Sequence, residues 1–388
     1  GQLLFYPTKY SVNDYHVNSV SYCINDSISG IGSTDLGNTV RIESNTTTIP
    51  VGFSTTTTIV GIASTYRTSK VLVQYGAVDN SYFEYDELTV IHNGSEVELI
   101  EYGQLSTDSL GPFGSSGLGT YSAYLSGSNL NIDFTPNSGL GVTFNVNTLR
   151  VSIADTSSTG VSTSQLNTGI LDSRITSIAS STSPIANTVA TYSKPYSCAY
   201  YLVSVEDNTN NEYQVSEVVV ADDSSIPSWT EFGILQTGSN LGSFDATIVG
   251  SETRLTFTPI ANSDIQVRVF QNALRLVDTT STSTIIDLDN ASIQTGYGSY
   301  EGTDADIKRE FELTHRQNPI FKRNFIGSAS TIVNLTDNLI KIPNHFFVTG
   351  EELTYRHSGA GTTQAIGIVT TSIVGIGSTR DSLVDILK

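Results

Sequence analysis

The sequence predicts an all-β protein: tandem β-sandwiches joined by Ser/Thr-rich linkers, followed by a small β-rich C-terminal domain. Three observations support this fold class. The chain contains an internal repeat, its apolar residues fall in short β-branched and aromatic runs between turn residues, and Ser, Thr, Asn and Gly take the place of charge. Only 15% of the 388 residues are charged, against about 25% in an average soluble domain. A chain of this length is expected to form roughly two to four domains.

The internal repeat is the strongest of these signals. Glu101–Leu105 (EYGQL) matches Glu231–Leu235 (EFGIL) at an offset of 130 residues, and Phe134-Thr-Pro matches Phe257-Thr-Pro at an offset of 123. The lost residues correspond to a Gly- and Ser-rich loop at 112–119, which only the first copy has. A register kept across a loop insertion indicates two copies of one fold. We therefore expect Phe134 and Phe257 to be buried core residues on equivalent strands.

Short strands and tight turns are expected within each copy. Val142–Val146 alternates apolar and polar residues, which predicts one buried and one solvated face. Ser126-Gly-Ser and Val249-Gly-Ser lie between alternating runs, which is a hairpin signature. Further along, Leu149-Arg-Val matches Leu274-Arg-Leu. The spacing of roughly six to eight strands per copy is typical of a β-sandwich.

The repeat and the composition together predict five segments. These are an N-terminal extended or β segment at 1–55, the first sandwich at 56–155, a linker at 156–183, the second sandwich at 184–283, and a C-terminal β-rich assembly domain at 284–388. Within the linker, the apolar residues of Gln165–Ile178 have near-helical spacing, which favours a short helix. Gly169 and the Ser/Thr content act against that helix.

Charge and hydropathy exclude several partners. The net charge of −19 repels DNA and RNA, so no nucleic-acid partner is expected. No apolar run approaches the roughly 20 residues of a spanning helix, so no membrane insertion is expected. Cys23 and Cys198 stand far apart without short-spaced metal-ligating partners, which predicts two buried or half-buried thiols. The chain starts at Gly1 and contains no Met, and we expect it to be the ordered part of a longer polypeptide.

Common catalytic and cofactor-binding motifs are missing from the sequence. It contains no HExxH, GxSxG, P-loop or GxGxxG-helix pattern, so we expect no catalytic residues, no cofactor and no metal. The carboxylate pairs are expected to be solvated turn residues. A Ca²⁺ site or a glycosidase pair is the alternative. These pairs are Asp222-Asp223, Asp287-Leu-Asp289 and Asp304-Ala-Asp306.

Aromatic residues near the loops have two interpretations. Exposed tyrosines are common recognition residues and would suit a glycan, whereas alternating tyrosines on strands usually pack across a sheet. The residues concerned are Tyr82, Phe83, Tyr85, Tyr121, Tyr124, Tyr297 and Tyr300.

The C-terminal segment has a different surface from the rest of the chain. Residues 301–388 carry a net charge of −1, while residues 1–300 carry −18. Its basic residues are interspersed with phenylalanines, and Arg with aromatic side chains is typical of interface anchors. The predicted interface residues are Arg309, Phe311, Arg316, Phe321, Arg323 and Phe325. The alternative is an amphipathic strand whose Phe side chains fill a local core.

Several short motifs resemble one class of proteins. Gly30–Thr34 and Gly375–Thr379 both read GIGST, Thr58–Thr65 (TIVGIAST) is a variant of this turn, and Pro343–Tyr355 reads PNHFFVTGEELTY. With the Ser/Thr-rich β-repeats, they resemble large β-rich virion structural proteins of tailed marine phages, especially contractile-tailed cyanophages. The resemblance implies a non-enzymatic part of the tail, fibre, baseplate or collar.

Partners and location follow from the same resemblance. It implies assembly with other virion subunits or with copies of the same chain, location in the extracellular particle, and a host surface glycan as a further partner. A bacterial surface adhesin or S-layer-type protein shares the compositional features and is the first alternative, with a location on the cell surface. A carbohydrate-active enzyme on a tail spike is the second alternative.

Overall fold

The computed structural model describes most of the chain up to residue 300 and three short strands beyond it. The described residues are 15–24, 31–107, 117–137, 140–156, 162–165, 169–223, 225–260, 262–275, 283–288, 290–300, 333–334, 339–341 and 383–385. Every helix or strand element in these ranges is a strand, which confirms the all-β class. The chain divides into two compact units, one of residues 16–299 and one of residues 1–15 and 300–388.

The second of these units contributes one small sheet to the description. It contains the antiparallel strands β22 (Val333–Asn334), β23 (Leu339–Lys341) and β24 (Leu383–Asp385) in that order. All six predicted interface residues from Arg309 to Phe325 lie outside the described residues.

The first sandwich has a six-stranded and a three-stranded antiparallel sheet. The larger sheet contains β2 (Gly32–Leu36), β3 (Val40–Ile49), β10 (Phe144–Ala154), β5 (Tyr66–Ala77), β6 (Phe83–His92) and β7 (Val97–Ser106), in that order. The smaller sheet contains β4 (Thr57–Ala63), β9 (Asn129–Pro136) and β8 (Gly119–Ser126). Their facing sides form one hydrophobic core, in which Val71, Ile132 and Phe134 are buried.

The second sandwich repeats the first strand by strand. Its six-stranded sheet contains β11 (Ser162–Gln165), β12 (Gly169–Ile178), β19 (Ile265–Arg275), β14 (Tyr196–Asp207), β15 (Glu212–Asp222) and β16 (Pro227–Gln236). Its three-stranded sheet contains β13 (Asn187–Ser193), β18 (Glu252–Pro259) and β17 (Gly242–Val249). The spatial order of equivalent strands is identical in the two copies.

The register of the strands tests the repeat. Phe134 and Phe257 occupy equivalent positions on β9 and β18 and are 1% and 0% exposed, which confirms the prediction. The extra residues of the first copy lie between β7 and β8. The match of Leu149 with Leu274 is wrong: Leu149 lies opposite Leu72, and the residue opposite Leu202, the counterpart of Leu72, is Phe270.

The predicted helix at Gln165–Ile178 is also wrong, because Gln165 ends β11 and Gly169–Ile178 form β12. β12 pairs along its length with β19, and its apolar residues serve two opposite faces, Leu171 on one and Ile178 on the other. That division of apolar residues imitates helical spacing. A missed sequence match identifies the strand: Leu171–Ile178 corresponds to Ile42–Ile49 of β3 at an offset of 129.

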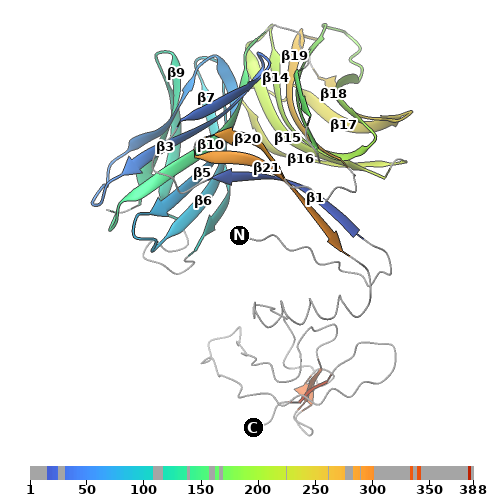
Figure 1. The fold of residues 1–388 in the computed structure, drawn as a ribbon. Helices are drawn as coiled ribbons and strands as arrows, with labels where there is room; N and C mark the ends of the chain where they lie inside the picture. The colour runs from blue at the N-terminus through green and yellow to red at the C-terminus, as the bar shows by residue number, and fades with distance from the viewer. Residues whose placement is uncertain are drawn as a thin grey trace. The chain divides into compact units, whose positions relative to one another are not determined.

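A third sheet lies between the sandwiches, as Figure 1 shows. It consists of β1 (Tyr15–Ile24), β21 (Ala291–Tyr300) and β20 (Ser283–Leu288) in that order. It helps to bury the outer face of β10, so the predicted solvated face of Val142–Val146 is wrong: Asn145 is 7% exposed, and Asn147 further along β10 is 0% exposed. The amide of Asn147 accepts a hydrogen bond from Thr46 Oγ1 at 2.7 Å, and Asn290 beside β21 donates to the same hydroxyl at 2.6 Å.

Glycines fix the turns and the close sheet packing in both copies. Gly127 and Gly250 have φ angles of 61° and 63° in the predicted hairpin turns, where a side chain would be strained. Gly119 and Gly242 instead face the phenylalanine rings of the neighbouring strand. A Cβ atom at Gly119 would lie 2.6 Å from Phe134 Cε2, and one at Gly242 would lie 2.7 Å from Phe257 Cε2.

Replacing Gly119 or Gly242 by Ala is expected to lower the free energy of unfolding by about 1–3 kcal/mol, because the new Cβ atom would collide with the phenylalanine ring and also with the facing backbone carbonyl, Thr135 O or Thr258 O, and both must shift. Gly141→Ala is the matched control, since a Cβ atom there meets nothing within 4 Å. This control is expected to be neutral or to stabilise by up to about 1 kcal/mol. Urea unfolding followed by circular dichroism measures all three. A Gly119→Ala variant as stable as its Gly141→Ala control would contradict this packing.

Candidate functional site

The two sandwiches pack against each other through the outer faces of their six-stranded sheets. Strands contact their own counterparts across this boundary: β5 contacts β14, β6 contacts β15, β10 contacts β19, and β2 contacts β11. Contacts between equivalent elements are the mark of an isologous, two-fold-like interface. Here that interface lies within one chain.

A third hydrophobic core fills this boundary. Its buried members include counterparts from the two copies, namely Ile42 and Leu171, Leu72 and Leu202, and Leu149 and Phe270. Ile293 of β21 and Leu288 of β20 belong to the same core. Each fully buried side chain of this kind stabilises the packed state by about 1.5–3 kcal/mol, so the core favours one rigid body over two independent sandwiches.

Repeated bulges on the edge strands position two equivalent carboxylates in this boundary. Gly103 of β7 and Gly233 of β16 have φ angles of 76° and 61°, and each lies at a register shift in its ladder. This geometry is a β-bulge that requires Gly. The glycines belong to the repeated EYGQL and EFGIL segments. They lie against the side chains of Glu87 and Glu217. A Cβ atom added at Gly103 would lie 3.5 Å from Glu87 Cγ, and one added at Gly233 would lie 3.1 Å from Glu217 Oε1.

A single lysine on β5 pairs with both of these carboxylates. Lys70 Nζ lies 3.0 Å from Glu87 Oε2 and 2.7 Å from Glu217 Oε2, and it donates a hydrogen bond to Tyr102 Oη at 2.8 Å. Burial opposes the charge of Lys70, but Tyr200 and Glu217 outweigh it and raise the pKa of Lys70 above its ordinary value. The lysine therefore stays charged between the two sandwiches.

Glu217 is the most enclosed member of this Lys70 cluster, with 0% exposure. Besides Lys70, it accepts hydrogen bonds from Tyr200 Oη at 2.7 Å, from Thr89 Oγ1 at 3.1 Å and from Tyr102 Oη. A buried carboxylate is tolerated when its oxygens are occupied in this way. Tyr200 occupies the position in the second copy that Lys70 occupies in the first, so the pairing is asymmetric although the fold is duplicated.

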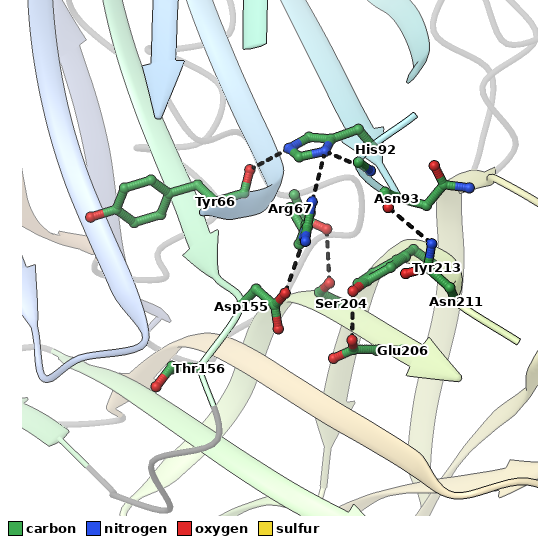
Figure 2. Close-up of polar contacts among 12 residues, drawn as sticks. Tyr66, Arg67, His92, Asn93, Asp155, Thr156, Ser204, Glu206, Asn211 and Tyr213 are labelled. Carbon is green, nitrogen blue, oxygen red and sulfur yellow. Dashed lines mark hydrogen bonds and ion pairs between the residues drawn. The ribbon is translucent and has the colours of Figure 1, made fainter. Parts of the chain in front are cut away.

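A second polar network closes another part of the boundary (Figure 2). Arg67 donates from Nε to Asp155 Oδ2 at 3.1 Å and lies 3.3 Å from His92 Nδ1. Because Gly94 N also donates to Nδ1, at 3.2 Å, the proton of His92 is on Nε2, which donates to the carbonyl of Tyr66 at 3.1 Å. Burial and the charge of Arg67 lower the pKa of His92 to about 4. The imidazole is therefore neutral and acts as a structural acceptor.

The same network extends into the second sandwich through buried Arg268. Its guanidinium lies 2.9 Å from Asp155 Oδ1 and 2.7 Å from Glu206 Oε2, and Tyr213 Oη donates to Glu206 at 2.5 Å. Figure 2 also shows the direct hydrogen bond to Ser204, which is donated by Thr68 at 2.8 Å. The ion pair between Arg268 and Asp155 and the hydrogen bond between Thr68 and Ser204 join the two copies.

Beside the Lys70 cluster lies a cavity of about 460 Å³. Both six-stranded sheets and β1 contribute to its wall, which is apolar over most of its area and includes Val20, Leu72, Leu202 and Phe270. Cys198 also lines it. Cys23 and Cys198 are free, half-buried thiols, as predicted, and burial raises the pKa of Cys198.

A separate acidic cluster lies inside the first sandwich. Glu84 and Asp86 alternate with Leu88 on the inward face of β6 and are almost fully buried. Asp86 accepts a hydrogen bond from Tyr121 Oη at 2.5 Å, and Glu84 accepts one from Leu118 N at 3.0 Å. Burial raises the pKa of Asp86 to about 7. The hydrogen bond from Tyr121 lowers this pKa, and the charge on Glu84 raises it further.

The second copy shows that the fold does not require these acids. The positions equivalent to Glu84 and Asp86 hold Gln214 and Ser216. Gln214 Oε1 accepts a hydrogen bond from Leu241 N at 2.9 Å, which is the same backbone contact that Glu84 makes in the first copy. The acidic pair is therefore particular to the first sandwich. Sequence reasoning missed it because Glu84 and Asp86 occupy inward positions of an alternating strand.

The structure places the other predicted residues as follows. Of the aromatic residues considered for glycan recognition, Tyr82 and Tyr121 pack in the core of the first sandwich, Tyr85 packs in the third core, and Tyr124 is exposed. Asp223 is exposed in a turn, where Ser225 donates to it.

Comparisons with protein-family models, with curated proteins and with solved structures gave no match to this chain. Among the residues described, no group of three or more His, Cys, Asp or Glu is placed to hold a metal ion. The described part of the chain also has no helix that is long and apolar enough to cross a membrane. The described residues therefore offer three chemical features: ion pairs between the two copies, an apolar cavity, and a separate acidic cluster.

The raised pKa of Asp86 predicts a pH dependence of stability. Its ordinary unfolded value is about 3.9, so between pH 4 and pH 7 the unfolded chain loses this proton while the folded chain keeps it. The free energy of unfolding must then fall as pH rises, by up to about 4 kcal/mol from this group. Asp86→Asn removes the group, so the variant is expected to match the wild type near pH 4 and exceed its stability near pH 8.

Urea unfolding at pH 4, 6 and 8 measures this effect. The control is Asp223→Asn, because hydrogen bonds from Ser225 and Ile226 lower the pKa of this exposed carboxyl to about 2 and it stays ionised throughout the range. The free energy of unfolding of the control is expected to change with pH in parallel with that of the wild type. Parallel curves for the wild type and Asp86→Asn would show that Asp86 is ionised in the folded protein.

Proposed function

We propose that this chain is a non-enzymatic structural protein of a tailed-phage virion, a part of the tail, fibre, baseplate or collar. In this proposal it assembles with copies of itself or with other virion subunits and contributes to host attachment. The duplicated, all-β construction supports a mechanical role. The third core and the two polar networks join the packed sheets of the two sandwiches.

The observation that carries the proposal is that the edge strand β16 exposes apolar side chains. It ends its six-stranded sheet, so its outer side presents backbone groups that another strand could pair with. It also exposes Trp229, Phe232 and Ile234, in a strand whose single charged residue is Glu231. Edge strands are normally protected by charge, proline or bulges, and β16 has one charge, a proline at its first position and the bulge at Gly233. An apolar edge on an otherwise acidic protein suits a permanent contact with another subunit.

Charge supports a second contact in the same assembly. The acidic sandwiches repel one another at long range, whereas residues 301–388 are nearly neutral and carry a basic cluster. The arginines Arg309, Arg316 and Arg323, with the phenylalanines among them, would complement an acidic sandwich of a neighbouring subunit. Such steering weakens as salt screens it.

Light scattering and negative-stain imaging of the purified chain test the proposal. The wild type is expected to form ordered multimers. Phe232→Lys on β16 should raise the protein concentration at which multimers form at least tenfold, because it places a charge on the edge strand. Ile185→Lys is the control, since Ile185 is an apolar residue that is even more exposed than Phe232 but lies outside the strands. A dispersed monomer at all concentrations, or equal assembly of both variants, would contradict the proposal.

Three further tests bear on the proposal, and the last two separate the virion from its alternatives. The double change Arg316→Glu and Arg323→Glu should abolish assembly at low salt if the C-terminal contact exists. A gene position among tail and capsid genes supports a virion protein, whereas a position among secretion genes supports an adhesin or S-layer protein. Release of reducing ends from host polysaccharide would instead support the tail-spike enzyme.

A further inference from the structure

The cavity between the sandwiches has the size and the wall of a small-molecule site. Its volume of about 460 Å³ equals roughly fifteen water molecules at their bulk share of about 30 Å³ each, and it falls in the usual range for ligand pockets. Apolar side chains form most of the wall, so water there gains few hydrogen bonds. Replacing that water with an apolar molecule is favourable.

Most polar groups at the cavity are already satisfied. Lys70 gives its three protons to Glu87, Glu217 and Tyr102. Glu87 Oε1 accepts from Tyr85 Oη at 2.9 Å, and Glu217 has donors on both oxygens. These charges therefore offer no free partner to a charged ligand, and their sum of one positive and two negative charges repels an anion.

One pair of polar groups on the wall is different. Asn272 of β19 is 7% exposed, and its Oδ1 atom is buried without a hydrogen-bond partner. Its Nδ2 atom donates to Tyr22 Oη of β1 at 3.3 Å. Because that hydroxyl is used as an acceptor, its own proton is available, and the described residues show no acceptor for it. Burial raises the pKa of Tyr22 to about 12, so the proton is retained.

The duplication shows that the strand position does not demand an asparagine. The equivalent residue in the first copy is Val151, which lines the same cavity. An unsatisfied buried amide oxygen is costly, and here it replaces an apolar side chain in an apolar wall. A bound group that donates to Asn272 and accepts from Tyr22 would remove that cost.

We propose that this cavity binds a neutral, apolar molecule with a hydroxyl group, such as a medium-chain alcohol. The hydroxyl donates to Asn272 Oδ1 and accepts from Tyr22 Oη, and the chain lies against Leu72, Leu202 and Phe270. β1 is the edge strand of its sheet, so it can shift aside to admit the ligand while both sandwiches stay intact. The inference does not depend on the proposed function.

Titration calorimetry with 1-decanol and with decanoate tests this site in the full chain. Decanol is expected to bind at one molecule per chain, and decanoate at least tenfold more weakly, because its carboxylate meets the Asn272 oxygen and a net negative charge. Asn272→Leu, which keeps the side-chain size, should weaken decanol binding about tenfold. Asn147→Leu is the matched control, since Asn147 is a buried asparagine of the equivalent strand that does not line the cavity.

A measurement without substitutions guards against variants that fail to fold. Nuclear Overhauser effects between decanol and the methyl groups of Val20, Leu72 and Leu202 are expected in the wild type. Absence of decanol binding, equal affinity for decanoate, unchanged affinity in Asn272→Leu, or contacts only to methyl groups outside the cavity wall would each overturn the proposal.

Discussion

The packing of one six-stranded sheet against its own repeat is the constraint on which the rest of this structure depends. It buries both faces of the central strands, so β10 and β19 are buried along almost their whole length. Antiparallel strands with one solvated face could carry polar side chains on that face freely. Here such side chains need partners, which is why Ser204 and Arg268 are held by a hydrogen bond and an ion pair across the boundary, and Asn147 by a hydrogen bond from Thr46 of the neighbouring strand.

Duplication then explains the ion pairs at the centre. A two-fold-like interface brings equivalent residues near each other, so Glu87 and Glu217 both approach the boundary beneath their bulge glycines. The half-buried carboxylate of Glu87 and the buried carboxylate of Glu217 would repel one another without a cation. Lys70 from the first copy neutralises part of that charge, and its counterpart Tyr200 adds a hydrogen bond rather than a second charge. The interface is therefore symmetric in backbone and asymmetric in chemistry.

The sequence predicted the local features and missed those made by the boundary. The fold class, the repeat, the hairpin glycines and the burial of Phe134 and Phe257 followed from periodicity and turn chemistry. β12 was missed because its apolar residues serve two cores, which a single-face pattern cannot represent. The Lys70 cluster could not be predicted either, since Lys70 and Glu217 are 147 positions apart and only packing brings them together.

Differential scanning calorimetry of the chain tests the central claim that the two sandwiches are one body. If the third core and the buried ion pairs join them, residues 16–299 unfold in a single transition whose calorimetric and van't Hoff enthalpies agree. Lys70→Met, which leaves Glu217 buried without its cation, should lower the midpoint of that one transition. Two separate transitions in the wild type, with Lys70→Met shifting only one of them, would show that the sandwiches unfold independently.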